Sequence, residues 1–133
     1  MVEHGFGTEF RLLTSAQFKT VFDGATRKAS GSCVLLLARP NGLGHSRLGL
    51  VIAKKSVRRA VDRNKVKRIA RESFRLNKTE LGSLDIVVLA RKGLGELDNA
   101  ALHDLYQGMW RKLAKSADKP PRSRHSGPPS SNA

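Results

Sequence analysis

The sequence predicts an α+β domain, a small sandwich in which helices cover a mostly antiparallel sheet. The chain has 133 residues, enough for one domain of ordinary size. Its apolar residues, 39% of the total, gather into short blocks that could form one modest core. Some blocks have helical spacing and others are continuous β-prone runs. Their order is helix, strand, strand, helix, strand, helix.

The first predicted helix covers about residues 15–23. Thr14 and Gln17 have the spacing of a capping box, in which each side chain bonds the backbone amide of the other residue. Three apolar residues follow at helical spacing: Phe18, Val21 and Phe22. Gly24 then ends the pattern, because glycine is a common stop residue after a helix.

Two β-prone segments follow the first helix, at residues 32–40 and 46–55. The segment between them, residues 41–44, reads Asn-Gly-Leu-Gly, a composition typical of turns. The sequence therefore predicts that these two strands form an antiparallel hairpin.

The second half of the chain predicts a helix, a strand and a final helix. The helical pattern covers about residues 62–76, and the continuous apolar run at residues 84–90 is typical of a buried strand. The helix over residues 62–76 thus lies on a strand-helix-strand crossover. Asp98 is a suitable cap for the last helix, whose apolar spacing continues to Leu113.

The two ends of the chain differ from this domain, which is predicted to span residues 10–115. Residues 1–9 form a short polar lead that we expect to be flexible. Residues 116–133 are rich in Pro, Ser and Gly and are expected to form a disordered basic tail. The longest apolar run has six residues, too few for a membrane span. The single cysteine, Cys33, excludes an internal disulfide and fits a cytoplasmic location.

Positive charge is concentrated in one segment. The formal net charge is +14, and residues 54–75 contain ten Lys or Arg against Asp62 and Glu72, a net of +8. A nearly neutral body with one dense basic segment is the layout of a surface that binds a polyanion. Nucleic acid is the commonest such partner.

A helical wheel of residues 62–76 separates apolar from cationic side chains. One arc is expected to face the sheet: Val66, Ile69, Ala70, Ser73 and Phe74. The opposite side has four cations and one amide, which we name the cationic stripe: Asn64, Lys67, Arg68, Arg71 and Arg75. Lys65 lies on a separate flank. Like charges one turn apart repel by a few tenths of a kcal/mol, so the stripe indicates an anionic ligand.

Phosphate is the anion that this spacing fits best. Side chains three and four residues apart on a helix project about 5–6 Å from one another, close to successive phosphates of folded RNA. Further cations precede the helix: Lys54, Lys55, Arg58 and Arg59. The alternative is a solvated charged face, but the one-sided stripe, the basic approach and the neutral body together favour RNA binding.

Other residues leave alternatives open or give no signal. Phe18 and Phe22 could pack in the core or line a groove for single-stranded nucleic acid. Histidines and acidic residues show no metal-ligand spacing and no pairing of nucleophile with base. We therefore predict that the protein has no catalytic residue and no metal site of its own.

Residues 47–75, RLGLVIAKKSVRRAVDRNKVKRIARESFR, resemble the bacterial ribonuclease P protein family. The likeness extends over about residues 10–113. The family's signature motif falls on Arg63, Asn64, Lys67, Arg68 and Arg71. Lys65 stands where the family usually has arginine, which keeps the charge but not the planar fork.

The resemblance implies that the protein assists a catalytic RNA in removing the 5′ leader from precursor tRNA. The RNA would carry the Mg²⁺-dependent chemistry, one protein would serve each RNA, and the protein alone would be inactive. The resemblance also implies a fourth strand. A ribosomal or other structural RNA-binding protein is the alternative function, and an independent nuclease is a third hypothesis.

Two groups of site residues follow from the sequence and the resemblance together. The predicted RNA-binding residues are Lys54, Lys55, Arg58, Arg59, Arg63, Asn64, Lys65, Lys67, Arg68, Arg71 and Arg75. The resemblance further implies a cleft between the first helix and the sheet that receives the single-stranded leader. Its expected residues are Phe18, Phe22, Leu36 and Lys67.

Overall fold

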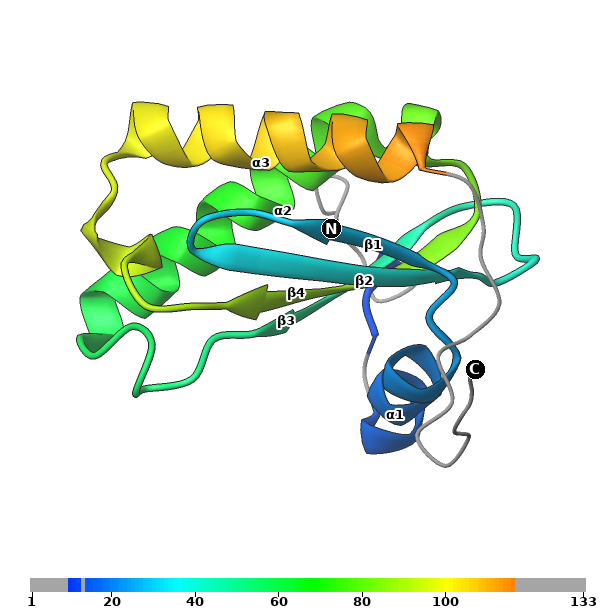
Figure 1. Cartoon of the computed structure of the whole chain (residues 1–133), viewed down its shortest axis with the longest axis horizontal. Coiled ribbons are helices and arrows are strands. Elements are labelled where there is room, and N and C mark those ends of the chain that lie inside the picture. Colours follow the sequence, from blue (N-terminus) through cyan, green and yellow to red (C-terminus); the bar gives the residue numbers. More distant parts are fainter. Residues whose placement is uncertain (1–9, 13, 117–133) are drawn as a thin grey trace, which may run out of the picture.

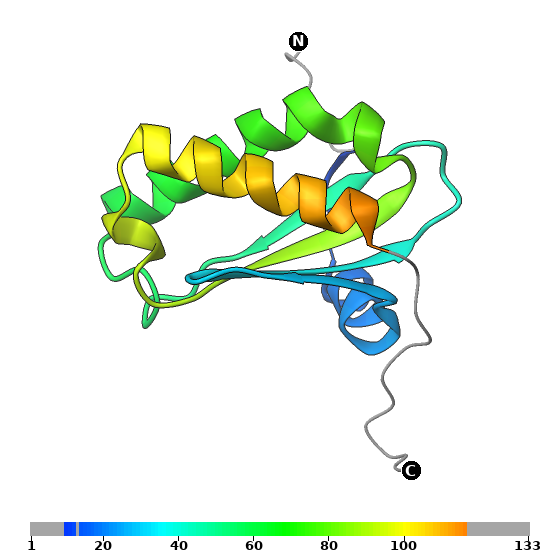
Figure 2. The ribbon, with the colours of Figure 1, turned by 45° about the horizontal axis from the view of Figure 1, so that its top comes forward.

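The computed structural model describes residues 10–12 and 14–116, and the predicted lead and all of the predicted tail except Ser116 lie outside these ranges. A four-stranded sheet has two long helices on one face and a short helix on the other (Figures 1 and 2). The elements are α1 (Ser15–Gly24), β1 (Arg27–Ser30), β2 (Val34–Pro40), β3 (Arg47–Val51), α2 (Ala60–Leu81), β4 (Leu84–Ala90), η2 (Leu94–Glu96) and α3 (Asn99–Lys115). The predicted α+β class is confirmed.

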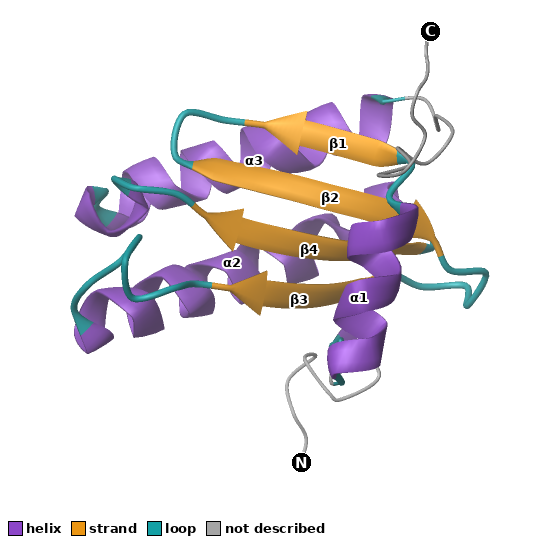
Figure 3. Cartoon of the chain, turned by 60° about the horizontal axis from the view of Figure 1, so that its bottom comes forward, coloured by secondary structure: helices purple, strands orange, loops and turns teal. Residues whose placement is uncertain are grey.

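The strand order is β1-β2-β4-β3, as the face-on view of the sheet shows (Figure 3). β4 is antiparallel to β2 and parallel to β3. The predicted hairpin between β2 and β3 is therefore wrong, because β4 lies between them. The first five residues of β4 are all buried, which explains its central place. The basic helix α2 forms the crossover between the parallel strands β3 and β4.

β1 is the strand that the residue pattern did not predict, although the resemblance implied a fourth one. Its sequence is RKAS, and only Ala29 is buried. It forms the sheet edge beside β2, in antiparallel register. Such a short polar segment has no alternation of apolar residues that could identify it.

The capping box predicted for α1 is confirmed. The Gln17 backbone amide donates to Thr14 Oγ1, and the Thr14 amide donates to Gln17 Oε1, both at 3.1 Å. α1 begins and ends within one residue of the predicted bounds. It lies across the sheet face opposite α2 and α3 (Figure 3).

α2 is longer than predicted, because its buried stripe continues beyond residue 76. Asn77 and Leu81 are buried on the same side as the predicted inner residues, all five of which are buried. The helix ends at Leu81, and the next residue, Gly82, caps it with a φ of 71° that favours glycine. At the other end α2 begins at Ala60, two residues earlier than predicted.

α3 packs on α2 through hydrogen-bonded aromatic side chains. Trp110 Nε1 donates to Ser73 Oγ at 2.8 Å, and the Tyr106 hydroxyl donates to the Val66 carbonyl at 3.2 Å. The Trp110 ring also meets Phe74 edge to face, with centroids 5.9 Å apart. Burial raises the pKa of Tyr106 and keeps its hydroxyl protonated as a donor. These contacts fix the rotation of α2 about its own axis.

A partly buried ion pair joins the starts of β3 and β4. Arg47 binds Asp85 with two hydrogen bonds of 2.8 and 2.6 Å, and Asn41 Nδ2 donates to the same carboxylate at 2.8 Å. The hydrogen bond to Asp85 raises the pKa of Arg47. Arg47 and Asp85 are also direct partners in the parallel register. The pair therefore fixes the position of β3 relative to the central strand.

Candidate nucleic-acid interface

The cationic stripe lies on the side of α2 opposite its buried face. Asn64, Arg68 and Arg75 are exposed, whereas Lys67 and Arg71 are half-buried. A hollow of about 690 Å³ follows this side of the helix. Its lining includes Val61, which is 60% exposed. The structure therefore brings the stripe together on one solvent-facing side of α2, as the helical wheel predicts.

Two of the predicted RNA-binding arginines also form ion pairs with carboxylates of the protein. Arg68 lies 3.6 Å from Glu72, and Arg59 lies 3.4 Å from Asp62. Glu72 also lies 3.7 Å from His103. Both arginines are more than half exposed, and exposed pairs of this length contribute about 0–1 kcal/mol. A phosphate can therefore replace these carboxylates at low cost.

Arg63 and Lys65 make contacts within the protein. The Arg63 guanidinium donates to the carbonyls of Val57 and Arg58 at 3.1 and 2.9 Å. Lys65 Nζ donates to the Leu97 carbonyl at 2.9 Å. Arg63 thus holds the loop before α2, and Lys65 holds the segment after η2. These bonds hold both side chains against the protein, although Lys65 also lines the hollow beside the stripe.

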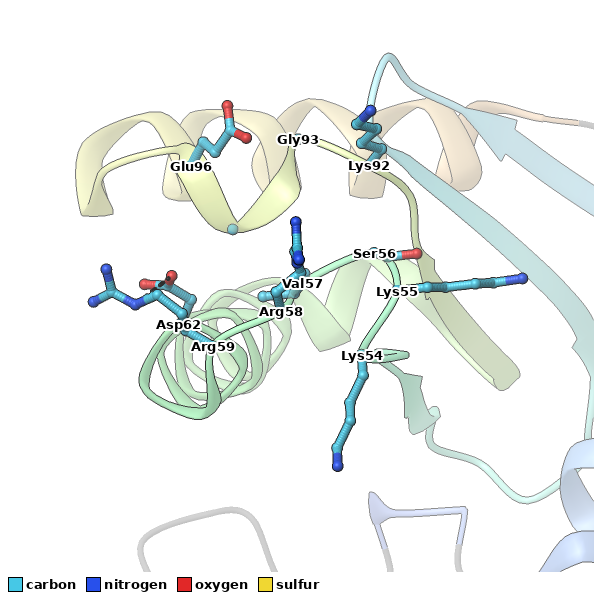
Figure 4. A pocket seen from close by; sticks show the side chains of 11 residues that line it. Lys54, Lys55, Ser56, Val57, Arg58, Arg59, Asp62, Lys92, Gly93 and Glu96 are labelled. Carbon is cyan, nitrogen blue, oxygen red and sulfur yellow. Dashed lines mark ion pairs between the residues drawn. The ribbon is translucent and has the colours of Figure 1, made fainter.

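The start of α2 borders a second and larger hollow of about 870 Å³ (Figure 4). Its cationic lining comes from two loops: Lys54, Lys55, Arg58, Arg59 and Lys92. Figure 4 shows Lys54, Lys55 and Lys92 pointing in different directions. The site therefore suits an extended polyanion that passes the rim better than one small anion held at its centre. Lys92 is absent from the sequence prediction because it lies outside the basic segment.

Lys67 and Arg71 face a third hollow, of about 210 Å³, beside the edge of the sheet. Arg11 lines the same hollow. Desolvation and the charge of Arg11 both lower the pKa of Arg71, in that order of importance. Arg11 is brought there because Leu12 N donates to the Leu48 carbonyl of β3 at 3.0 Å. Sequence reasoning missed Arg11, since a lone arginine before the first helix carries no spacing signal.

An apolar hollow of about 450 Å³ adjoins α1. Phe18, Phe22 and Val51 provide its apolar surface. Phe22 is 40% exposed, so it is not a core residue, and Phe18 is half-buried. The structure thus favours the groove interpretation for Phe22. Phe18 both packs on the core and lines the groove.

Leu36 does not belong to this groove, so its predicted place in the cleft is wrong. Its side chain is 0% exposed and belongs to the core between the sheet and the long helices. Its neighbour Leu37 packs on the α1 side instead. Successive side chains of a strand point to opposite faces, so a shift of one residue exchanges the core for the groove.

Within the described ranges, no three His, Cys, Asp or Glu side chains lie close enough to bind a metal ion. None of the helices described there could cross a bilayer, since each is too short or too polar. The four hollows described above, three with basic linings and one apolar, lie around α2 and α1.

Comparison with known proteins identifies the family. The family described as Ribonuclease P matches residues 6–114 of this chain. The chain belongs to the ribonuclease P protein family. A ribonuclease P protein component from Pseudomonas putida (strain GB-1) is 53% identical over 126 residues, covering 95% of this chain and 94% of that protein.

Solved structures of ribonuclease P proteins have the same fold. The structure from Staphylococcus aureus aligns with a TM-score of 0.66 at 27% identity, covering 80% of this chain and 93% of that one. The structure from Thermotoga maritima aligns with a TM-score of 0.64 at 35% identity, covering 76% of this chain and 96% of that one.

Family membership decides between the functions that the sequence left open. It implies partnership with ribonuclease P RNA and a part in the endoribonuclease that processes the 5′ ends of precursor tRNA. The ribosomal alternative is not supported. Membership in the ribonuclease P protein family thus explains why one small domain has both a basic helix and a groove.

Proposed function

We propose that this protein is the RNA-binding subunit of a ribonuclease P in which the RNA carries out the hydrolysis. The protein alone is inactive, one protein binds each RNA, and the complex is cytoplasmic. Mg²⁺ enters with the RNA, which carries out the hydrolysis in this proposal. The RNA-binding side chains are those of the cationic stripe and the cations that line the hollow at the start of α2, Lys54, Lys55, Arg58, Arg59 and Lys92.

The arrangement of α2 is the observation that carries this proposal. Arg68 and Arg75 are exposed on one side, while Val66 and Phe74 on the other are fully buried. One guanidinium group can bind two oxygens of a phosphate at the same time, which suits an RNA backbone. Since the inner side is anchored by packing, the cations reach the RNA from a rigid support.

The groove beside α1 receives the single-stranded leader of precursor tRNA in this proposal. The exposed Phe22 ring offers a surface on which a base can stack. Lys67 and Arg71 lie at the junction between the stripe and the groove, because they line the hollow that Phe18 also lines. The two sites are therefore continuous, and one protein can hold the RNA subunit and the leader together.

Reconstitution tests this function. Cleavage of precursor tRNA is measured with the full chain alone, with the RNA subunit alone, and with both, at low Mg²⁺ concentration. We expect no cleavage by the protein and strong stimulation of the RNA by the protein. Cleavage by the purified protein alone would favour an independent nuclease. Lack of stimulation would reject the proposed role as a subunit.

A further inference from the structure

The Phe18 ring rests on a glycine of the neighbouring strand. Gly49 lies in β3, and a Cβ atom added to it would lie 2.6 Å from Cε2 and 2.7 Å from Cζ of Phe18. The same atom would lie 3.0 Å from Cδ1 of Leu12. Carbon atoms in packed proteins do not approach so closely, so any side chain at this position has to displace the ring.

The surroundings of the ring limit where it could move. Phe18 packs on a small core cluster beneath α1, formed by Leu12, Val21 and Val87. Val21 and Val87 are 0% exposed, and Val87 is the register partner of Gly49 in β4. Because this cluster is filled, a displaced ring would have to move into one of the two hollows that it lines.

The ring also separates two hollows of different character. On one side lies the 210 Å³ hollow, where the cations are Arg11, Lys67 and Arg71. On the other side lies the 450 Å³ hollow, where Phe22 and Val51 provide apolar surface and the lysine at the border, Lys19, is paired with Asp23. Phe18 lines both. A nucleotide has the same division, with a charged phosphate at one end and an apolar base face at the other.

We propose that Gly49 is a positioning residue of the leader groove. By letting the Phe18 ring lie directly on β3, it keeps a cationic subsite for a leader phosphate apart from an apolar subsite for a base. Arg11 thereby becomes a phosphate-binding residue of the groove, together with Lys67 and Arg71. This inference rests on the proposed leader-binding function.

The alternative role for Gly49 is purely structural, since a glycine within a strand often marks a close approach that only serves packing. In that case a larger residue would lower stability but leave substrate choice unchanged. The informative quantity is therefore the leader preference, defined as the Kd for mature tRNA divided by the Kd for precursor tRNA.

The experiment replaces glycine with alanine in the full chain, reconstituted with the RNA subunit. We expect Gly49→Ala to lower the leader preference about tenfold, the scale of one lost base-stacking contact, while the Kd for mature tRNA is unchanged. Gly108→Ala is the matched control, because nothing lies within 4 Å of the added atom on α3. The control keeps the full leader preference.

A double variant tests whether Gly49 acts through the ring and covers the case in which Gly49→Ala fails to fold. In a Phe18→Leu background the shorter side chain makes room, so adding Gly49→Ala should leave the leader preference as in Phe18→Leu alone. Additive losses, or an unchanged leader preference in Gly49→Ala, would overturn the inference about Gly49 but not the proposed function of the groove. A wild-type complex without leader preference would overturn the proposed groove function as well.

Discussion

The inner and outer faces of α2 belong to one helix but are held in place by different forces. On the inner face, Val66 and Phe74 are fully buried, and Ser73 accepts a hydrogen bond from Trp110. Burying one large apolar side chain contributes about 1.5–3 kcal/mol. On the outer face, Arg68 has a long, exposed ion pair that contributes about 0–1 kcal/mol. The inner face thus specifies the fold, and the outer face is available for a ligand.

The largest expected effect concerns the inner face. Trp110→Ala removes a fully packed ring and leaves the Ser73 hydroxyl without its donor. We expect the free energy of unfolding to fall by about 3–5 kcal/mol. Chemical denaturation followed by circular dichroism measures this, since Trp110 is the only tryptophan and its fluorescence is lost with it. A loss below about 1 kcal/mol would mean that α3 does not anchor α2.

The next effect concerns the outer face, where we expect a loss of RNA affinity and almost no loss of stability. Arg68→Gln should weaken binding to the RNA subunit about tenfold, the cost of one charge-assisted hydrogen bond. The unfolding free energy should change by less than about 0.5 kcal/mol, because the side chain is exposed. Filter binding and denaturation on the same preparation compare the two quantities. Equal losses in both would break the distinction between the faces.

Lys65 lies between the inner and outer faces of α2, so its substitution tests how far the properties of the two faces differ. Lys65→Met keeps most of the side-chain length but removes the hydrogen bond to the Leu97 carbonyl. We expect a loss of about 0.5–1.5 kcal/mol in unfolding free energy. The affinity for RNA should fall less than in Arg68→Gln. If Lys65→Met weakens RNA binding more than Arg68→Gln does, Lys65 belongs to the contact surface.

The smallest effect concerns Glu72, the carboxylate that lies near Arg68 and His103. Glu72→Gln removes a competitor for the arginine and one negative charge near the RNA. We expect RNA affinity to rise about twofold, as for a pair worth a few tenths of a kcal/mol. Titration of the RNA subunit at low salt detects this change. A lower affinity would show that Glu72 positions Arg68 for the ligand.

Helical elements and the stripe could be predicted because their information is local. The capping box at Thr14 and the 3.6-residue spacing of the inner α2 residues depend only on neighbours in sequence. All five predicted inner residues are buried, and the stripe lies opposite them.

Strand pairing and groove residues could not be predicted in the same way, because they depend on contacts distant in sequence. Nothing in the runs that became β2 and β3 indicates that β4 separates them. Leu36 and Leu37 are alike in chemistry, and only the placement of α1 decides which of them faces the groove. Arg11 enters the site through one backbone contact with β3.

The salt dependence of RNA binding tests most directly whether the outer face of α2 contacts phosphates. The Kd for the RNA subunit is measured over a range of salt concentrations for Arg68→Gln/Arg71→Gln and for Arg111→Gln/Lys115→Gln. The second pair removes the same charge from exposed residues of α3. We predict that the slope of log K against log salt falls by about 1.5–2 in the α2 variant only. An equal change in both variants would contradict the assignment of the stripe.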